Sequence, residues 1–403
     1  MEEWKEIKLK EATDIIGDGI HGTPVFSDDG DFFFVNGNNL CNGEIAIKQD
    51  TKRTSLSEYK KYKKELTDRT LFVSINGTIG NTAKYNGEPI VLGKSACYLN
   101  VNKDYDYDFI YYIINSPDFL RCITGLATGT TIKNVSLKTI REYSFKAPSK
   151  EKQTKIAEVL KSLDDKITLN NRINHNLEQQ AQTLFKSWFV DFEPFKQERF
   201  VNTEMGLIPK DWSIVPFFDI VRLCSGGTPK TEQPDYWGGN IPFFTPKDVS
   251  ISPFCLKTEK YITKSGLDHC NSHLYEPFTT FITARGTVGK LCMAGYPMAM
   301  NQTNYAICSI SIDPILAFLF SKQIVNNLKN KANGAVFDAI TTRDFEGERI
   351  IMAPENILSK FSSTIRPLYN QILENEKQSL ELAKTRDLVL PALMTGQTIN
   401  HNC

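Results

Sequence analysis

Apolar residues recur at helical spacing in two long stretches of the chain. In residues 149–189 they stand three or four positions apart, and neither Pro nor Gly interrupts them. Residues 355–390 repeat this spacing and contain Pro367, which predicts a kink. A narrow apolar stripe is typical of a helix that packs on one partner. At ~1.5 Å per residue the first helix would be roughly 60 Å long, so we expect it to stand between domains.

Short motifs that occur twice predict an internal duplication. Each long stretch follows an Ala-Pro pair, and Trp4 and Trp212 open similar segments. The Gly-Thr-hydrophobic-Gly motif stands at Gly77–Gly80 and again at Gly286–Gly289. Self-similarity at fixed spacing is the mark of a repeated architecture. The chain therefore reads as a globular domain and a helix, followed by a second domain and a second helix.

Each globular part is predicted to be mixed α/β. Runs of β-branched and aromatic residues between Gly, Asn and Pro predict strands at Phe32–Val35, Thr70–Ile75 and Phe278–Thr283. Helices are expected at Tyr107–Asn115 and Pro314–Lys331. The expected divisions are a first domain at 1–148, a spacer helix at 149–190, a linker at 191–205, a second domain at 206–354, a second helix at 355–394 and a tail at 395–403.

Composition places the chain among ordinary globular proteins. Lys and Arg number 47, as do Asp and Glu, so the formal net charge is zero, and 41% of residues are hydrophobic. The nine Cys include no Cys-x-x-Cys pair and indicate reduced thiols. No run of apolar residues is long enough to span a membrane, and no signal-peptide pattern opens the chain. We expect a soluble, cytoplasmic protein that does not bind membranes.

No complete catalytic or metal-binding pattern is present. Gly87–Ser95 resembles a phosphate-binding loop but has five residues between its glycines where four are needed. His269 and His273 have the spacing of a helical zinc pair, but no other ligand pair supports them. Neither a hydrolase elbow nor a glycine-rich cofactor loop occurs. The chain is therefore expected to be non-catalytic and to hold neither metal nor cofactor.

Two kinds of segment could meet nucleic acid, and a third stretch reads as a functional loop. Gly in the two Gly-Thr turns permits a close approach of the backbone to a ligand, and exposed N–H groups could meet phosphate, although an ordinary hairpin turn is the alternative. Thr51–Glu65 contains six basic residues interleaved with two Tyr, although a solvated surface helix is the favoured interpretation of such a block on its own. The Gly- and Pro-rich stretch Ser225–Asp248 reads as a long ordered loop, which is usually functional.

The pattern resembles the specificity subunits of type I restriction-modification systems. The resemblance rests on the tandem plan and on Gly226-Gly-Thr-Pro with Tyr236-Trp-Gly-Gly-Asn-Ile-Pro-Phe-Phe-Thr-Pro-Lys-Asp-Val249. Further support comes from Ala284-Arg-Gly-Thr-Val-Gly-Lys290 and from Pro148-Ser-Lys-Glu-Lys-Gln153 at the start of the first helix. It covers nearly the whole chain and is stronger in the second half.

This resemblance implies a fold and a division of labour. Two mixed α/β target recognition domains would be joined by two long antiparallel coiled-coil helices with internal pseudo-two-fold duplication. Each domain would read one half of a bipartite sequence in double-stranded DNA. The helices would set the spacing and dock methyltransferase subunits, and a helicase-nuclease restriction subunit would join the complex. S-adenosylmethionine, ATP and Mg would be bound by those partners.

Site residues follow from loop position and donor chemistry. The expected phosphate contacts are Lys52, Lys60, Lys63, Lys133, Arg285 and Lys290, with Thr78 and Thr287 in the two Gly-Thr turns. The expected base-reading residues are Asn38, Asn39, Thr245 and Lys247. The helix positions expected to bind partner subunits are Leu163, Ile167, Leu177, Leu184, Ile365 and Ile372.

Two other interpretations remain open from the residues. The chain could be a non-catalytic coiled-coil scaffold with two α/β interaction modules and no DNA target, which zero net charge and an Asn-rich helix would suit. It could also be an enzyme built from two copies of an unfamiliar fold, but the lack of any complete catalytic pattern argues against this.

Overall fold

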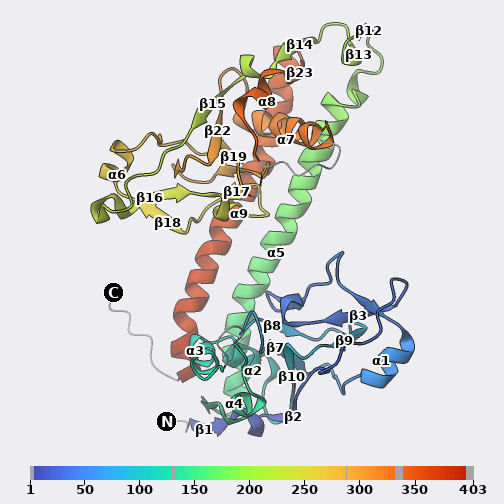
Figure 1. Cartoon of the computed structure of the whole chain (residues 1–403), viewed down its shortest axis with the longest axis vertical. Helices are drawn as coiled ribbons and strands as arrows, with labels where there is room; N and C mark the ends of the chain where they lie inside the picture. Colours follow the sequence, from blue (N-terminus) through green and yellow to red (C-terminus); the bar gives the residue numbers. More distant parts are fainter. Residues whose placement is uncertain (1–3, 129–132, 287, 332–338, 396–403) are drawn as a thin grey trace. The chain divides into compact units, whose positions relative to one another are not determined.

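The computed structural model describes residues 4–128, 133–286, 288–331 and 339–395 (Figure 1). Its contacts divide the chain into two units. Unit 1 contains residues 1–167 and 381–403, and unit 2 contains Thr168–Leu380. Unit 1 is therefore discontinuous in sequence. The two long helices are α5 (Lys150–Phe189) and α9 (Glu355–Thr395), and each contributes one part to each unit.

Unit 1 is built on antiparallel and mixed sheets. One sheet has the order β2-β10-β7-β8, and a second, β6-β3-β9, contains the parallel pair β3 and β9. Strands β1 and β11 form a separate antiparallel pair. The elements of unit 1 before α5 are β1 (Lys5–Lys8), η1 (Leu9–Glu11), β2 (Thr13–Asp18), β3 (Phe32–Val35), η2 (Gly37–Asn39), β4 (Leu40–Cys41), β5 (Glu44–Ile45), β6 (Arg53–Thr54), α1 (Leu56–Tyr62), β7 (Thr70–Ser74), β8 (Thr82–Lys84), β9 (Ile90–Leu92), β10 (Ala96–Val101), α2 (Tyr107–Ile114), α3 (Pro117–Gly125), α4 (Leu137–Glu142) and β11 (Ser144–Ala147).

Unit 2 repeats this strand order. The sheet β15-β22-β19-β20-β17 corresponds to β2-β10-β7-β8 with one added strand, and β18-β16-β21 corresponds to β6-β3-β9, again with one parallel pair. The elements of unit 2 between the long helices are η3 (Glu193–Phe195), β12 (Phe200–Thr203), β13 (Gly206–Pro209), β14 (Ser213–Pro216), η4 (Phe217–Asp219), β15 (Val221–Ser225), η5 (Pro234–Tyr236), β16 (Trp237–Phe244), η6 (Pro246–Asp248), β17 (Phe254–Cys255), β18 (Lys260–Ile262), α6 (Lys264–Asp268), β19 (Thr280–Thr283), β20 (Leu291–Ala294), β21 (Ala299–Met300), β22 (Asn304–Ser309), α7 (Pro314–Lys331), α8 (Thr342–Glu346) and β23 (Arg349–Met352).

Side-chain caps explain where the short helices of unit 1 begin. Ser55, Asp106, Ser116 and Ser136 each accept a hydrogen bond from the backbone N–H three residues later, at the start of α1, α2, α3 and α4. Such caps satisfy an N–H group that has no partner inside the helix. The two helices expected from sequence appear as α2 and α7, and the three expected strands as β3, β7 and β19.

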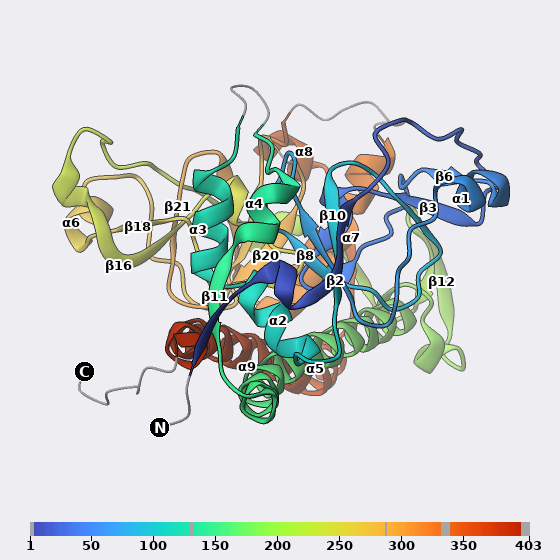
Figure 2. The same cartoon turned by 90° about the horizontal axis from the view of Figure 1, so that it is seen from below.

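The apolar stripes of the long helices complete the core of each unit. In unit 1, Ile156 and Leu160 of α5 and Leu390 and Met394 of α9 lie in one buried cluster with α2 and β10. Figure 2 shows α2 beside α5, where the backbone N–H of Asp106 donates to the Gln153 side chain at 3.0 Å. Removing these side chains from water is the main source of stability for both helices.

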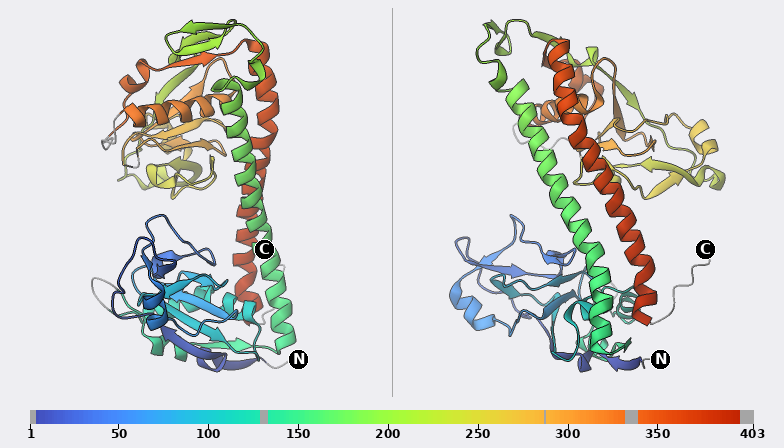
Figure 3. Two further views of the ribbon diagram at one scale, coloured as in Figure 1. Left: turned by 90° about the vertical axis from the view of Figure 1, so that its right-hand side faces the viewer. Right: turned by 180° about the vertical axis from the view of Figure 1, so that it is seen from behind.

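Unit 2 gathers aromatic rings around its part of the two long helices. Phe185 and Phe189 of α5 contact Phe361 of α9 and Phe320 of α7, with ring centroids 4.8–6.3 Å apart. Figure 3 shows α7 beside α5, and Lys322 of α7 pairs with Glu178 of α5 at 2.7 Å. Helix α9 continues through Pro367 without a break.

The stretch expected to be a linker, residues 191–205, is folded. It contains η3 and β12, and β12 pairs with β13 in an antiparallel hairpin. Phe192 and Phe195 are buried, with ring centroids 5.3 and 5.2 Å from that of Trp212. Aromatic burial of this kind fixes a segment that polar composition alone would leave free.

Candidate nucleic-acid interface

A capped 3₁₀ turn follows strand β3 in unit 1. The backbone N–H of Asn36 donates to the Asn39 side-chain oxygen at 3.0 Å, and the Asn39 N–H donates to the Asn36 carbonyl at 2.9 Å. The Asn39 amide nitrogen donates to the Ala46 carbonyl at 3.0 Å and to the Thr51 hydroxyl at 3.3 Å. Asn39 is therefore buried and closes the turn, whereas Asn38 at the tip is exposed.

The same turn follows strand β16 in unit 2. The backbone N–H and the hydroxyl of Thr245 both donate to Asp248 at 2.7 Å, and the Asp248 N–H donates to the Thr245 carbonyl at 3.0 Å. The other Asp248 oxygen accepts from the Glu259 N–H at 2.7 Å. Lys247 occupies the tip, with 80% of its side chain exposed.

The two Gly-Thr turns are built around a buried hydroxyl. In unit 1 the Ser74 hydroxyl donates to the Thr78 carbonyl and accepts from the Asn81 N–H at 2.8 Å. In unit 2 the Thr283 hydroxyl accepts from the Lys290 N–H at 3.0 Å. The left-handed backbone of the first Gly in each turn, with φ of 75° and 82°, explains why Gly is needed there.

A third segment joins the Gly-Thr turn in each unit. In unit 1, Asn134 forms a bridge with Asn76, and the Val135 N–H donates to the Ile75 carbonyl at 2.8 Å. In unit 2, Ala339 bridges Arg285, and the Ile340 N–H donates to the Ala284 carbonyl at 2.9 Å. In unit 1 the capped turn also meets the Gly-Thr turn, because a Cβ added to Gly37 would lie 2.8 Å from the Ser74 side chain. We call these three segments the turn cluster of each unit.

The turn clusters collect most of the predicted DNA-contacting residues. Asn38, Thr78 and Lys133 are exposed in or beside the cluster of unit 1, and Lys247, Arg285 and Lys290 are exposed in that of unit 2. Asn39 and Thr245 make the closing bonds of the capped turns, so the structure gives both a structural role and their base-reading role stays a prediction. Thr287 lies outside the described residues.

The basic block of unit 1 lies on and around helix α1. Lys52, Lys60 and Lys63 are exposed, as phosphate contacts would need to be. The Phe32 ring stacks on Tyr59 at 4.1 Å between centroids, which holds α1 against β3, the strand that leads into the capped turn. Lys48, which was not among the expected contacts, is also exposed, and its ammonium donates to the Asn38 carbonyl at 3.3 Å.

The Gly- and Pro-rich stretch of unit 2 packs largely against its own neighbours. Tyr236 stacks on His269, with ring centroids 5.1 Å apart. The Trp237 indole N–H donates to the Lys230 carbonyl at 3.2 Å, and the Lys260 ammonium lies 5.5 Å from the Trp237 ring centroid. His269 thus takes part in stacking, and its ring nitrogen contacts the Ser265 carbonyl at 2.8 Å.

The predicted partner-binding positions on the helices divide into two groups. Leu163, Ile167, Leu177 and Leu184 are half-buried, so part of each side chain remains at the surface. Ile365 and Ile372 have no exposed surface and lie in the core of unit 2. A fully buried side chain cannot touch another protein directly, so the structure assigns these two residues to packing within the chain.

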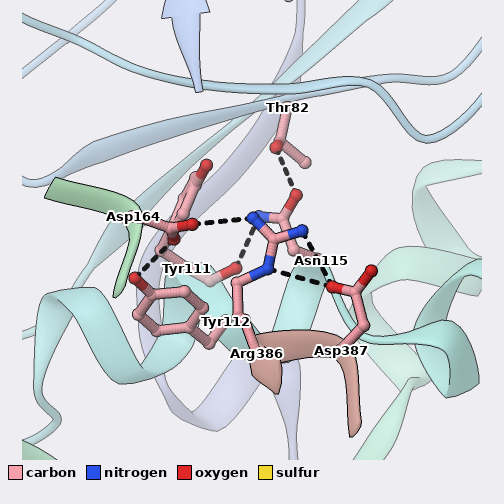
Figure 4. A network of polar contacts seen from close by, with 7 residues as sticks. All are labelled: Thr82, Tyr111, Tyr112, Asn115, Asp164, Arg386 and Asp387. Carbon is pink, nitrogen blue, oxygen red and sulfur yellow. Dashed lines mark hydrogen bonds and ion pairs between the residues drawn. The ribbon is translucent and has the colours of Figure 1, made fainter. Parts of the chain in front are cut away.

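A polar network fastens the end of α9 inside unit 1 (Figure 4). The Arg386 guanidinium contacts Asp164 of α5 at 2.7 Å and the neighbouring Asp387 at 2.8 Å. The Tyr112 hydroxyl of α2 donates to the second Asp164 oxygen at 2.8 Å. Burial and the hydrogen bond to Asp164 raise the pKa of Tyr112, so its hydroxyl stays protonated as a donor.

A cavity of about 530 Å³ lies beside the long helices in unit 2. Its lining residues include Asn174 and His175 of α5, Ile251 between η6 and β17, Leu256 directly after β17, and Glu376 of α9. Burial raises the pKa of Glu376 to about 7, the Ser252 hydroxyl opposes this shift by hydrogen bonding, and the nearby Glu178 charge adds to it.

The turn clusters present exposed hydrogen-bond donors, and the long helices present half-buried apolar side chains. In residues 4–128, 133–286, 288–331 and 339–395, no three His, Cys, Asp or Glu side chains are grouped as metal ligands. Within the same ranges, no helix combines the length and apolar content needed to cross a membrane. Exposed amide, hydroxyl and cationic groups on a fixed backbone are suited to binding phosphate and base edges.

Comparison with known proteins gives the family. The model of the type I restriction modification DNA specificity domain matches residues 1–179 and 209–382. The MjaIX specificity subunit of Methanocaldococcus jannaschii is 28% identical over 98% of this chain and 93% of that protein. The HindI specificity subunit of Haemophilus influenzae is 24% identical over 72% of this chain and 77% of its own length.

A solved structure agrees with this match at the level of fold. The type I restriction-modification S subunit from M. genitalium has a TM-score of 0.60 at 16% identity, covering 98% of this chain and 97% of the other. The doubled match of the family model corresponds to the repeated strand order of the two units. The chain belongs to the DNA specificity subunits of type I restriction-modification systems, which are non-catalytic members of those systems.

Proposed function

We propose that each unit reads one half of a bipartite sequence in double-stranded DNA through its turn cluster. The observation that carries this proposal is the repeated frame. The capped turn, the Gly-Thr turn and the bridging segment recur in both units, while their exposed side chains differ. Two units with the same backbone turns but different exposed side chains suit a target whose two halves differ in sequence. Phosphate contacts would position each domain, and tip residues would specify bases.

We also propose that the two long helices pair antiparallel about a pseudo-two-fold axis. Asn170 and Asn375 correspond at a separation of 205 residues, as do Asn174 and Ser379. The Asn170 amide donates to Ser379 at 3.2 Å, and the Asn375 amide donates to Asn174 at 2.8 Å. These are the same contact made in both directions, which is the pattern of an isologous interface and supports the axis.

The helix pair would then set the gap between the half-sites and dock the partner subunits. A helix of 40 residues is roughly 60 Å long, which is the scale of one to two DNA turns of ~34–36 Å each. The half-buried Leu163, Ile167, Leu177 and Leu184 would contribute to docking methyltransferase subunits. Those subunits would bind S-adenosylmethionine, and a restriction subunit would use ATP and Mg, so this chain would hold no cofactor itself.

The test is to co-express the chain with a type I methyltransferase subunit from the same genome and to map methylated adenines by single-molecule sequencing. We expect methylation at one split motif. Exchanging residues 206–354 for those of another family member should change one half of that motif and leave the other half unchanged. A stable complex that methylates no split motif would contradict the proposal and favour a scaffold.

A further inference from the structure

The capped turns of the two units make the same hydrogen bonds at corresponding residues. Asn36, Asn38 and Asn39 correspond to Thr245, Lys247 and Asp248, each pair 209 residues apart. In both turns the backbone N–H of the first residue donates to the side chain of the fourth residue, at 3.0 Å in unit 1 and 2.7 Å in unit 2. The backbone N–H of the fourth residue donates back to the carbonyl of the first, at 2.9 Å in unit 1 and 3.0 Å in unit 2. The third residue therefore occupies the same place on the same backbone in each unit.

Among the residues that the structure describes, only the third residue of each turn has an exposed polar side chain that takes no part in closing the turn. The side chain of the fourth residue already has its hydrogen-bond partners in each turn. Asn39 also donates to Ala46 and Thr51, and Asp248 also accepts from the Glu259 N–H. Asn38 is exposed, and the structure records a bond only for its carbonyl, which accepts from Lys48. Lys247 lies 3.8 Å from Glu259, and such an exposed pair holds an ammonium weakly.

In unit 1 the backbone of the tip is fixed beside the Gly-Thr turn. In unit 1 the Gly37 N–H donates to the Ser95 hydroxyl at 2.8 Å, and that hydroxyl donates to Asn36 at 3.0 Å. A side chain at Gly37 would collide with Ser74, which carries the Gly-Thr turn. A side chain on a fixed backbone beside phosphate-binding groups meets the geometric demand of base readout.

We propose that Asn38 and Lys247 are equivalent base-reading positions, one for each half of the target, and that Asn38 reads an adenine and Lys247 a guanine in the major groove. This inference rests on the function proposed above. An Asn amide can donate to adenine N7 and accept from its N6 amino group, whereas a Lys ammonium donates to guanine O6 and N7. The frame stays constant and the tip alone changes the base that is read.

The experiment exchanges the tips in the full chain, assembled with its methyltransferase partners. Lys247→Asn should replace one guanine by adenine in one half of the methylated motif, and Asn38→Lys should make the opposite change in the other half. Discrimination at the changed position should shift by about tenfold or more, as one good base contact provides. The gap and the untouched half should stay as in the wild type.

Two exposed residues away from the turns supply matched controls. Lys210→Asn changes the same residue types in unit 2, at a position whose N–H donates to the Arg199 carbonyl. Asn86→Lys does so in unit 1, in the turn between β8 and β9, at the far end of β9 from the capped turn. Both control variants should methylate the wild-type motif.

A second readout covers variants that assemble but do not methylate. The complexes of Lys247→Ala and Asn38→Ala are used to select duplexes from a library randomised in the half-sites, which reports binding without catalysis. Each should accept several bases at one position of one half. Unchanged motifs and selections for all tip variants would overturn the proposal, as would a change in both halves at once. A wild-type complex with no split motif would instead refute the underlying function.

Discussion

Single side chains decide how firmly the end of α9 is held in unit 1. Asp164 serves Arg386 and Tyr112 together, and roughly 30% of both the Asp164 and Arg386 side chains is exposed. Asp164→Ala would leave a half-buried cation and a buried hydroxyl without their shared acceptor. We expect a loss of about 1–3 kcal/mol in the free energy of unfolding, measured by urea denaturation.

The control for this prediction is the exposed pair between Arg121 and Asp118, whose side chains are 74% and 69% exposed. Arg121→Ala should change the unfolding free energy by less than about 0.5 kcal/mol, because such pairs are well solvated. Equal losses for Asp164→Ala and Arg121→Ala would show that the network contributes nothing beyond a surface pair.

The half-buried carboxyl of Glu376 makes stability depend on pH. Its pKa rises from 4.5 to about 7 in the folded state. Between these values the folded chain keeps a proton that the unfolded chain has lost, so this contribution is full below about pH 4.5 and declines up to about pH 7. Glu376→Gln should raise the unfolding free energy at pH 8 by on the order of 2 kcal/mol and flatten this slope.

Glu374→Gln is the matched control, since the Glu374 side chain is 66% exposed on the same helix. It should leave the pH dependence of unfolding as in the wild type. If Glu376→Gln kept the wild-type slope between pH 5 and pH 8, burial of the carboxyl would not be the cause.

Residue-level roles were only partly predictable from sequence. The exposed tips Asn38 and Lys247 followed from loop position and donor chemistry, but Asn38 and Asn39 are identical residues side by side, and only the fold decides which one closes the turn. Likewise, Arg386 and Asp164 are more than 200 residues apart, so no local pattern could pair them.

At the scale of elements, local periodicity predicted the helices and strands well, whereas the pairing of distant strands could not be predicted from it. The two stripes gave helices close to the expected bounds, and short β-branched runs gave β3 and β7. The parallel pairing of β3 with β9 joins residues more than 50 positions apart and leaves no periodic trace. The folded stretch at 191–205 was missed because its stability comes from burial of Phe192 and Phe195 against Trp212.

The contacts among Asn170, Asn174 and Asn375, between α5 and α9, predict a coupled effect on stability. Asn375 accepts from Gln371, donates to Asn174 and offers its carbonyl to Asn170. Asn375→Leu would leave the buried Asn174 amide without its donor and should cost about 1–3 kcal/mol of unfolding free energy. Adding Asn174→Leu should recover much of that loss, since apolar pairs replace buried polar pairs well.

A double-mutant cycle on the unfolding free energy measures this coupling. The exposed Asn176 supplies the comparison, and Asn176→Leu combined with Asn375→Leu should be additive. Additivity for Asn174→Leu with Asn375→Leu would mean that the two amides do not act as a pair.

The whole molecule has zero formal net charge, so its affinity for DNA should depend on a few local cations. We expect the isolated chain to bind its target weakly and to lose binding steeply as salt rises. Lys290→Ala should lower the slope of log affinity against log salt by about 1, whatever the DNA sequence, because one phosphate contact is removed.

Fluorescence anisotropy over a salt series provides the measurement, with Lys210→Ala as the comparison that should keep the wild-type slope. Tight binding by the isolated chain at ~200 mM salt would contradict the expected division of work with partner subunits.

The discontinuity of unit 1 has a consequence for synthesis on the ribosome. Its core needs Leu390 and Met394, which are made only after the whole of Thr168–Leu380. At ~5–20 residues per second, the first 167 residues wait roughly 10–40 s for their last helix. During that interval the apolar face that α9 will cover is open to chaperones and to the finished C-terminal helix of another copy. Translation timing thus becomes part of how unit 1 completes its core with its own helix.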